Sequence, residues 1–243
     1  MPPIGTTAPP PITDDCALFV DFDGTLAGLQ DDPDTVDLPP GGARVLERLA
    51  ARLAGALAVV SGRGLNDLAK RTPEGLWRVG GHGVSGAPPG AGPGDPQAAA
   101  PAALKDALEA IAAGAPGARV EAKGPVLALH YRAAPTAGPA LFEAVRAVTG
   151  AYDGYRAQHG KMVIEAKPVG ADKGAALRAL AETPPFAGRT PVAIGDDVTD
   201  EDMMAAAAKA GGWGVKVGAG TTCARYRVDG PTSVWRWLEE AAS

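Results

Sequence analysis

Three short apolar runs constrain the fold of this chain more than any other feature of its sequence. The runs are Cys16–Val20, Ala56–Val60 and Pro191–Ile194, and each ends abruptly in polar residues. Continuous apolar runs of this length are typical of strands buried on both faces of a parallel sheet. Segments with helical spacing lie between them, so the sequence predicts an α/β core with a Rossmann-like, doubly wound parallel sheet. Such sheets bind ligands beyond the carboxyl ends of their strands, where all three polar clusters fall.

A stretch rich in Gly, Pro and Ala, residues 86–101, interrupts this alternation and is typical of a flexible linker. After it, the order helix, strand, strand is predicted twice, over residues 102–113, 119–123, 126–132, 138–148, 152–157 and 162–165. Strands in adjacent pairs indicate antiparallel hairpins. We therefore expect a core formed by residues 1–86 and 168–243, with an inserted, smaller α+β cap domain over residues 87–167.

The polar cluster after the first apolar run is Asp21-Phe22-Asp23-Gly24-Thr25. Alternate residues of an extended segment face the same side, so we expect the carboxylates of Asp21 and Asp23 to converge. Two unpaired carboxylates are costly to bury unless a cation lies between them or one is protonated. Mg²⁺ prefers oxygen ligands and is commonly held by one or two carboxylates, while the Thr25 hydroxyl is suited to an anion. The alternative is an Asx turn at the strand end.

Two further segments offer groups suited to a phosphate. Ser61-Gly62-Arg63 follows the second run, and a hydroxyl with adjacent backbone N–H groups binds anions, although such residues are also common in ordinary turns and helix caps. Lys173 stands at the start of a predicted helix, where Asp172 is expected to be the N-cap. Beside a phosphate this lysine would neutralise developing charge, whereas most lysines are solvated surface residues.

The cluster after the third run, from Gly195 to Asp202, holds five acidic residues. Thr199 and Asp202 fit the spacing of a capping box at a helix N-terminus. That interpretation leaves Asp196 and Asp197 unexplained at the strand end, where a metal ion would need a further carboxylate.

In this order and spacing, DFDGTL, SGR, the lysine and GDDVTDED resemble the motifs of phosphatases of the haloacid dehalogenase superfamily. The resemblance implies that Asp21 is a nucleophile that becomes phosphorylated, and that Asp23 protonates the leaving sugar oxygen and later activates water. It also implies that Ser61 and Lys173 hold the phosphoryl oxygens. The Mg²⁺ ligands that it implies are Asp21, the backbone carbonyl of Asp23 and Asp196, with Asp200 bound through water or orienting Lys173.

Further motifs resemble those of the trehalose-6-phosphate phosphatase family. They are Gly81-His82-Gly83, Lys123-Gly124 followed by His130-Tyr131-Arg132, and the segment EAKPVGADKG from Glu165 to Gly174. The resemblance implies trehalose 6-phosphate as the substrate, with Glu165 and Lys167 of the cap hydrogen-bonded to sugar hydroxyls. The other substrate contacts that it implies are Thr25, Ser61, Gly62, Arg63, His82, Lys123, His130 and Arg132.

Plainer roles remain open for the cap residues and for the whole chain. His130 fits a cross-strand contact, and Lys123 and Arg132 fit solvated charges at a sheet edge. For the function, the alternatives are a related capped phosphatase that acts on sucrose 6-phosphate or mannosyl-phosphoglycerate, and a non-catalytic phosphosugar-binding subunit.

Charge and hydropathy exclude two classes of partner. The chain has 23 Lys and Arg against 28 Asp and Glu, a net charge of -5, which does not favour the basic face that nucleic acids require. No apolar run approaches the roughly 20 residues that span a membrane, and the N-terminal segment lacks the basic and apolar regions of a signal peptide. We expect a cytoplasmic monomer whose partner is a small phosphosugar, with no nucleic acid and no membrane.

Overall fold

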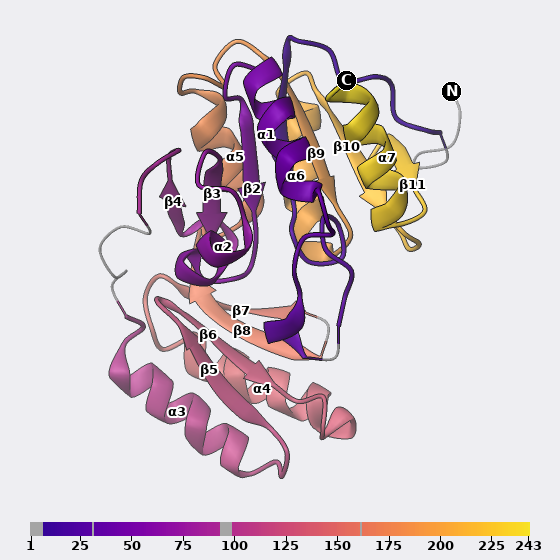
Figure 1. Ribbon diagram of the computed structural model, residues 1–243. Helices are drawn as coiled ribbons and strands as arrows, with labels where there is room; N and C mark the ends of the chain where they lie inside the picture. The colour runs from indigo at the N-terminus through magenta and orange to yellow at the C-terminus, as the bar shows by residue number, and fades with distance from the viewer. Residues whose placement is uncertain (1–6, 31, 93–98, 161) are drawn as a thin grey trace. The chain divides into compact units, whose positions relative to one another are not determined.

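The computed structural model describes residues 7–30, 32–92, 99–160 and 162–243. The chain divides into two compact units, residues 1–93 with 172–243 and residues 94–171 (Figure 1). Each unit has its own cluster of buried apolar residues. Both junctions lie a few residues later than the sequence predicts, because the strand Ser85–Ala87 pairs within the core sheet and the last cap strand runs to Pro168.

A seven-stranded sheet with the order β11-β10-β9-β1-β2-β3-β4 forms the centre of the first unit. All neighbouring strands are parallel except the antiparallel pair β3 and β4. The strands are β1 (Cys16–Val20), β2 (Leu57–Val60), β3 (Trp77–Gly80), β4 (Ser85–Ala87), β9 (Thr190–Gly195), β10 (Trp213–Val217) and β11 (Tyr226–Val228).

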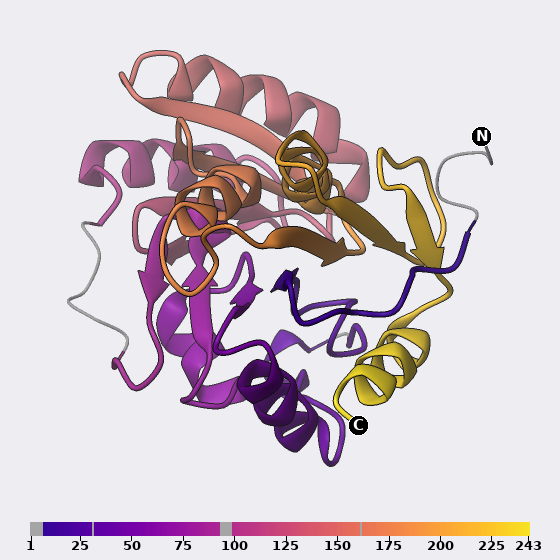
Figure 2. The same cartoon turned by 90° about the horizontal axis from the view of Figure 1, so that it is seen from above.

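Helices cover both faces of this sheet. They are α1 (Gly42–Arg52), α2 (Leu65–Arg71), α5 (Lys173–Ala181), α6 (Val198–Lys209) and α7 (Pro231–Ala241). Figure 2 shows α5 and α6 on one face and α1 and α7 on the other. The predicted doubly wound α/β core is therefore confirmed. None of the helices in the described part of the chain is long and apolar enough to cross a membrane.

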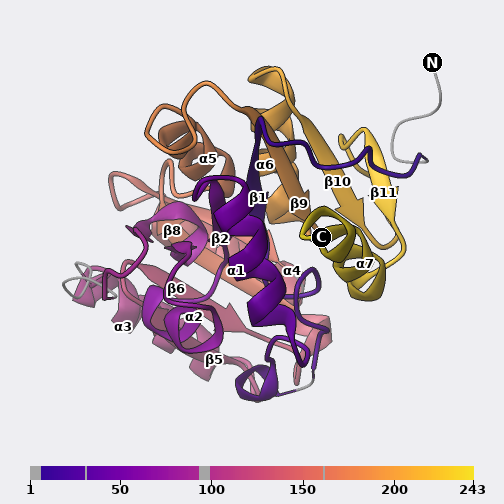
Figure 3. The same ribbon diagram turned by 45° about the horizontal axis from the view of Figure 1, so that its top comes forward.

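The three predicted core strands are neighbours in the sheet. β1 pairs with β9 on one side and with β2 on the other, and the strands lie side by side in Figure 3. Every residue of β1 and β2 is buried, as the apolar runs predict for strands packed on both faces. Because the strands are parallel, the polar segments that follow them meet at one edge of the sheet.

The second unit is an antiparallel sheet of four strands in the order β5-β6-β8-β7, with two helices on one face (Figure 1). Its elements are α3 (Ala102–Ala113), β5 (Arg119–Lys123), β6 (Val126–His130), α4 (Gly138–Thr149), β7 (Tyr155–Gly160) and β8 (Val163–Pro168). The twice-repeated order helix, strand, strand is thus observed. The strand predicted from residue 152 begins only at Tyr155, because Gly154 turns the chain with a φ of 81°.

Candidate active site

Asp21 and Lys173 form a buried ion pair at the carboxyl end of β1. The Asp21 N–H donates to the Ile194 carbonyl at 2.9 Å, which fixes the residue between β1 and β9. The Lys173 Nζ donates to Asp21 Oδ1 at 2.5 Å and to Asp200 Oδ1 at 2.6 Å. Lys173 is 3% exposed, so it is no solvated surface lysine. Asp172 caps α5 through a bond from the Ala175 N–H, as predicted.

Three carboxylates gather around this lysine. Asp21, Asp196 and Asp200 each offer an oxygen within 4.8 Å of the others. Burial raises the pKa of Asp21 well above its ordinary value, and the charge of Asp200 adds to this effect while Lys173 opposes it. Burial, followed by the charges of Asp200 and Asp197, raises the pKa of Asp196 to about 6. One ammonium does not balance three carboxylates, so this all-oxygen donor set fits a divalent cation such as Mg²⁺.

Asp200 holds the turn that carries Asp196. Its Oδ2 accepts the N–H groups of Asp196 and Asp197 at 3.0 and 2.9 Å, while its Oδ1 accepts from Lys173. The capping box of α6 is formed by Asp197 and Asp200, so the predicted box of Thr199 and Asp202 is wrong. The physical reason is the start of α6 at Val198, which makes Asp197 the N-cap residue and Thr199 part of the first turn.

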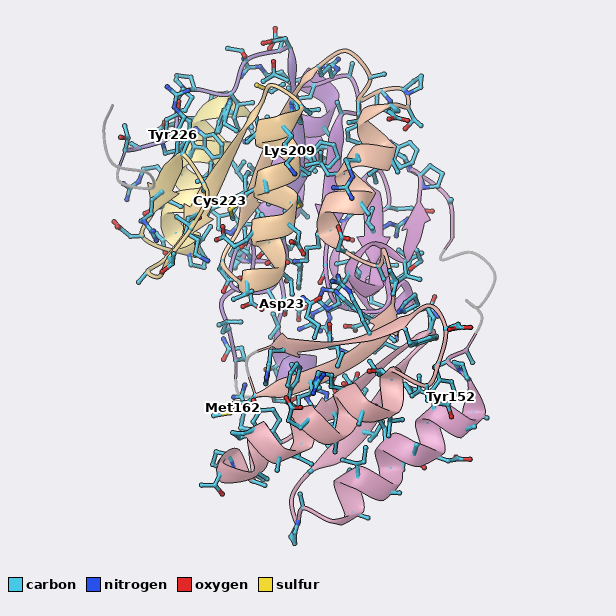
Figure 4. The ribbon with its side chains drawn as sticks, turned by 180° about the vertical axis from the view of Figure 1, so that it is seen from behind. Asp23, Tyr152, Met162, Lys209, Cys223 and Tyr226 are labelled. Atoms are coloured by element: carbon cyan, nitrogen blue, oxygen red, sulfur yellow. The ribbon has the colours of Figure 1, made fainter. Side chains whose placement is uncertain are left out.

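A second ion pair holds Asp23. Arg63 grips this carboxylate with two nitrogens, Nε to Oδ2 at 2.8 Å and Nη2 to Oδ1 at 2.7 Å. The side chain of Asp23 does not belong to the three-carboxylate group. β1 ends at Val20, so both aspartates lie beyond the strand, and their carboxylates have different ion-pair partners. A metal contact through the Asp23 backbone carbonyl stays a prediction. Figure 4 labels Asp23 at this end of the sheet.

The loop after β2 lies against the His82 turn within the first unit. The Gly81 and His82 N–H groups donate to the carbonyls of Arg63 and Ser61 at 2.7 and 3.0 Å. Only a glycine fits at position 62, because a Cβ there would lie 2.5 Å from the His82 ring. Ser61 is fully buried, and its Oγ accepts the Arg63 N–H at 3.1 Å.

Thr25 lies in the turn after β1 and is fully buried. Its hydroxyl has no hydrogen-bond partner among the residues that the structure describes. Leaving a hydroxyl unpaired is costly, which fits the expected contact with an anion.

Sequence reasoning missed one buried cation beside the acidic turn. Lys216, near the end of β10, is 4% exposed and donates to the Asp196 carbonyl at 2.5 Å. Its Nζ also lies 3.6 Å from Glu201 Oε1. The signal is a single lysine in the otherwise apolar run Trp213–Val217, close to the same sheet edge as the other polar groups.

The second unit brings four predicted residues onto one face of its sheet. Cross-strand partners share a face, and the register pairs Arg119 with His130, Ala128 with Glu165, and Arg156 with Lys167. With Lys123, which alternates along β5, the predicted residues on this face are Lys123, His130, Glu165 and Lys167. Arg132 follows β6 and is exposed.

Burial and contacts differ across this polar face. Glu165 and Lys167 are 6% and 1% exposed. His130 Nε2 lies 2.8 Å from Glu121 Oε2, and this hydrogen bond is the main cause that lowers the pKa of Glu121. Sequence reasoning missed Glu121, Arg156 and Gln158, which lie on the same face; Gln158 pairs with Glu165 in the register. Two-residue alternation within β5 and β7 is the signal for all three.

Comparisons with known proteins identify the family of the chain. A family model described as trehalose-phosphatase matches residues 19–232. Trehalose-6-phosphate phosphatase of Escherichia coli (strain K12) is 39% identical over 244 residues, which cover 96% of this chain and 89% of that protein. A probable trehalose-phosphate phosphatase of Sinorhizobium fredii is 42% identical over 212 residues, or 84% of this chain and 78% of that protein.

Solved structures share the fold. The C-terminal domain of Candida albicans trehalose-6-phosphate phosphatase has a TM-score of 0.82 at 20% identity, covering 98% of this chain and 99% of that one. A haloacid dehalogenase-like hydrolase from Bacteroides thetaiotaomicron has a TM-score of 0.61 at 15% identity, covering 92% and 98%. The family match and the two bacterial relatives confirm the resemblance seen in the motifs, and the chain belongs to the trehalose-phosphatase family.

Proposed function

We propose that this chain is a Mg²⁺-dependent phosphatase that hydrolyses trehalose 6-phosphate to trehalose and phosphate through an aspartyl-phosphate. The observation that carries the proposal is the buried group of Asp21, Lys173, Asp196 and Asp200 at the carboxyl end of β1. The relatives named as trehalose-6-phosphate phosphatases support the substrate. The group contains the proposed nucleophile Asp21, the buried cation Lys173 and the acidic turn of Asp196 and Asp200. These residues together favour an enzyme over a phosphosugar-binding subunit.

The chemistry follows from the two aspartates. An oxygen of Asp21 attacks phosphorus while the bond from phosphorus to the sugar oxygen breaks, and Asp23 gives that oxygen a proton. A water molecule then attacks phosphorus, passes a proton to Asp23 and releases phosphate, which restores Asp21. Lys173 lies 2.5 Å from Asp21, so its charge stabilises the phosphoryl oxygens as negative charge builds up.

Asp21 and Asp196 are the residues that we propose to hold the metal ion. Asp200 already accepts three hydrogen bonds through its two oxygens, so its role is to orient Lys173 and the Asp196 turn. When bound there, Mg²⁺ supplies the positive charge that lets an anionic nucleophile approach an anionic phosphate. The proposed donors to the phosphate are the Thr25 hydroxyl, which is buried and has no partner among the described residues, and the loop of Ser61.

The polar face of the second unit is the proposed source of sugar contacts. A site that hydrogen-bonds hydroxyls rejects analogues that lack them, because its own polar groups would be left unpaired. Glu165 and Lys167 are the candidates with the strongest geometric support, since both are buried and share one face. Gln158 and Arg156 extend the proposed set.

Phosphate release from a panel of sugar phosphates tests the proposal. The panel contains trehalose 6-phosphate, sucrose 6-phosphate, mannosyl-phosphoglycerate and glucose 6-phosphate, each measured with Mg²⁺ and with EDTA. We expect the highest kcat/KM for trehalose 6-phosphate, and no turnover in EDTA. A higher value for another sugar phosphate would refute the substrate, full activity in EDTA would refute the metal, and no release from any compound would favour the binding subunit.

A further inference from the structure

Arg63 is shared between two carboxylates. Two of its nitrogens bind Asp23, as described above, and its Nη1 donates to Asp67 Oδ2 at 2.7 Å. The Arg63 side chain is 10% exposed, and its guanidinium carbon lies 5.6 Å from the centre of the Phe22 ring. A planar guanidinium with five donors makes directional contacts of this kind. The orientation of the Asp23 carboxylate is therefore tied to the orientation of Arg63.

Asp67 is itself held on its other side. Arg71 Nε donates to Asp67 Oδ1 at 3.1 Å, and Arg71 Nη1 donates to the Val36 carbonyl at 2.5 Å. Arg71 also lies 3.3 Å from the exposed carboxylate of Asp37. Asp67 and Arg71 are the third and last residues of α2. Charges alternate along the series Asp23, Arg63, Asp67, Arg71 and Asp37. Both arginines are largely buried, and Asp37 is the most exposed of the three carboxylates that they bind.

We propose that Asp67 is a positioning residue for the proton transfer to the leaving group, acting through Arg63 on Asp23. The inference rests on the proposed function, in which Asp23 is the general acid. Asp67 holds the third nitrogen of the Arg63 fork, which fixes the plane in which the other two meet Asp23. Without Asp67, Arg63 can change its orientation, and the Asp23 carboxylate that it binds moves with it. The proton donor then loses its alignment with the leaving oxygen. Alignment of this kind is what general acid catalysis requires.

Leaving groups that differ in basicity separate this role from a structural one. A sugar alkoxide or a phenolate leaves with help from a proton, whereas p-nitrophenolate is a stable anion that leaves without one. The value of kcat/KM reports the steps up to departure of the leaving group, so breakdown of the aspartyl-phosphate does not enter. Phenyl phosphate and p-nitrophenyl phosphate both lack the sugar, so a difference between them is independent of sugar binding.

The experiment measures kcat/KM of Asp67→Asn on p-nitrophenyl phosphate, phenyl phosphate and trehalose 6-phosphate. We expect a change of less than about twofold on p-nitrophenyl phosphate and a loss of about tenfold on the other two, which is a fraction of the 10² to 10⁴ that general acids contribute. Asp67→Glu keeps the carboxylate and should restore part of the loss. Asp37→Asn is the matched control at the exposed end of the series, and should behave as the parent enzyme on all three substrates.

Two results would overturn the inference. Equal losses on all three substrates would assign Asp67 a structural role, and unchanged rates would remove it from the reaction. Thermal unfolding of each variant shows whether the fold is kept, and Asp67→Glu carries the test if Asp67→Asn does not fold. Failure of the proposed function is seen separately, as an absence of phosphate release by the parent enzyme.

Discussion

Gly24→Ala is a substitution whose effect on the proposed metal site follows directly from the structure. Gly24 has a φ of 80°, and a Cβ added there would lie 2.3 Å from Asp196 Oδ2 and 2.4 Å from its Cγ. Real contacts are never this short, so the Asp196 carboxylate must move. Because Asp196 is one of the two proposed metal-binding carboxylates, the added methyl group displaces a proposed ligand without changing any ligand.

Gly41→Ala is the matched control for backbone strain. Gly41 has a φ of 84°, and no atom lies within 4 Å of a Cβ added there. A left-handed conformation costs a residue with a side chain about 1–2 kcal/mol, so Gly41→Ala should lower the free energy of unfolding by about that amount and leave Mg²⁺ binding unchanged. Gly24→Ala should lower the free energy of unfolding through the same backbone strain, and it also displaces the Asp196 carboxylate. We expect it to weaken Mg²⁺ binding by roughly 10- to 100-fold, the range seen when support for a ligand is lost.

Two measurements check this prediction. Urea unfolding gives the free energy of unfolding of each variant without metal, and isothermal titration calorimetry gives the Kd for Mg²⁺. Equal Mg²⁺ affinity of Gly24→Ala and the parent enzyme would refute the reasoning, because it would mean that the position of the Asp196 carboxylate does not matter for the metal. Equal weakening in Gly41→Ala would instead trace the effect to general strain.

Other substitutions and conditions test the remaining parts of the site. Asp21→Asn should abolish phosphate release while preserving the unfolding midpoint, since an amide cannot form the acyl-phosphate; turnover near the parent rate would contradict the covalent route. Lys216→Met should weaken Mg²⁺ binding by about tenfold in calorimetry, because the Asp196 turn loses its charged donor; an unchanged Kd would exclude this role. The pKa of Asp196 is raised to about 6, so between pH about 4 and 6 the folded state binds a proton that the unfolded state has released. The metal-free protein should therefore lose stability as the pH rises through this window, whereas stabilisation by Mg²⁺ should increase. Thermal unfolding at pH 5 and 7.5, with and without Mg²⁺, measures both. Metal-free stability that rises with pH, or stabilisation by Mg²⁺ that falls with pH, would refute the assignment. Glu165→Ala should lower kcat/KM for trehalose 6-phosphate by roughly ten- to a hundredfold and spare p-nitrophenyl phosphate; equal losses would remove it from sugar binding.

The sequence predicts the core well because burial on both faces leaves a strong local pattern. The runs ending at Val20, Val60 and Ile194 become β1, β2 and β9, and β1 lies between the other two. Their order along the sheet does not follow from the runs alone, but parallel strands necessarily bring their carboxyl ends to one edge. That is sufficient to bring Asp21 and Asp196 together. Lys173 follows none of these strands, and its place at the start of α5 is set by the Asp172 cap.

The prediction is weaker where the chain leaves regular structure. Alternation along a strand says nothing about Asp23, because β1 has ended three residues earlier, at Val20. The sequence predicts the capping box two residues too late, because Thr199 and Asp202 have the same three-residue spacing as Asp197 and Asp200. Spacing alone does not distinguish these pairs. The helix start depends on where β9 ends, and the end of β9 depends on its pairing with β1 and β10.

Charges that act through another charge are the hardest part of the site to find in a sequence. Arg63, Asp67 and Arg71 are spaced four residues apart, the spacing of neighbours on a helix face, but this pattern is equally typical of solvated ion pairs worth little energy. Two features separate this case from solvated ion pairs. Both arginine side chains are only about one-tenth exposed, and Arg63 also binds Asp23 in the loop after β1. Only the fold joins a helical charge pattern to Asp23, the proposed acid of the reaction, so the spacing gains a proposed function once β1 and β2 are known to be neighbours.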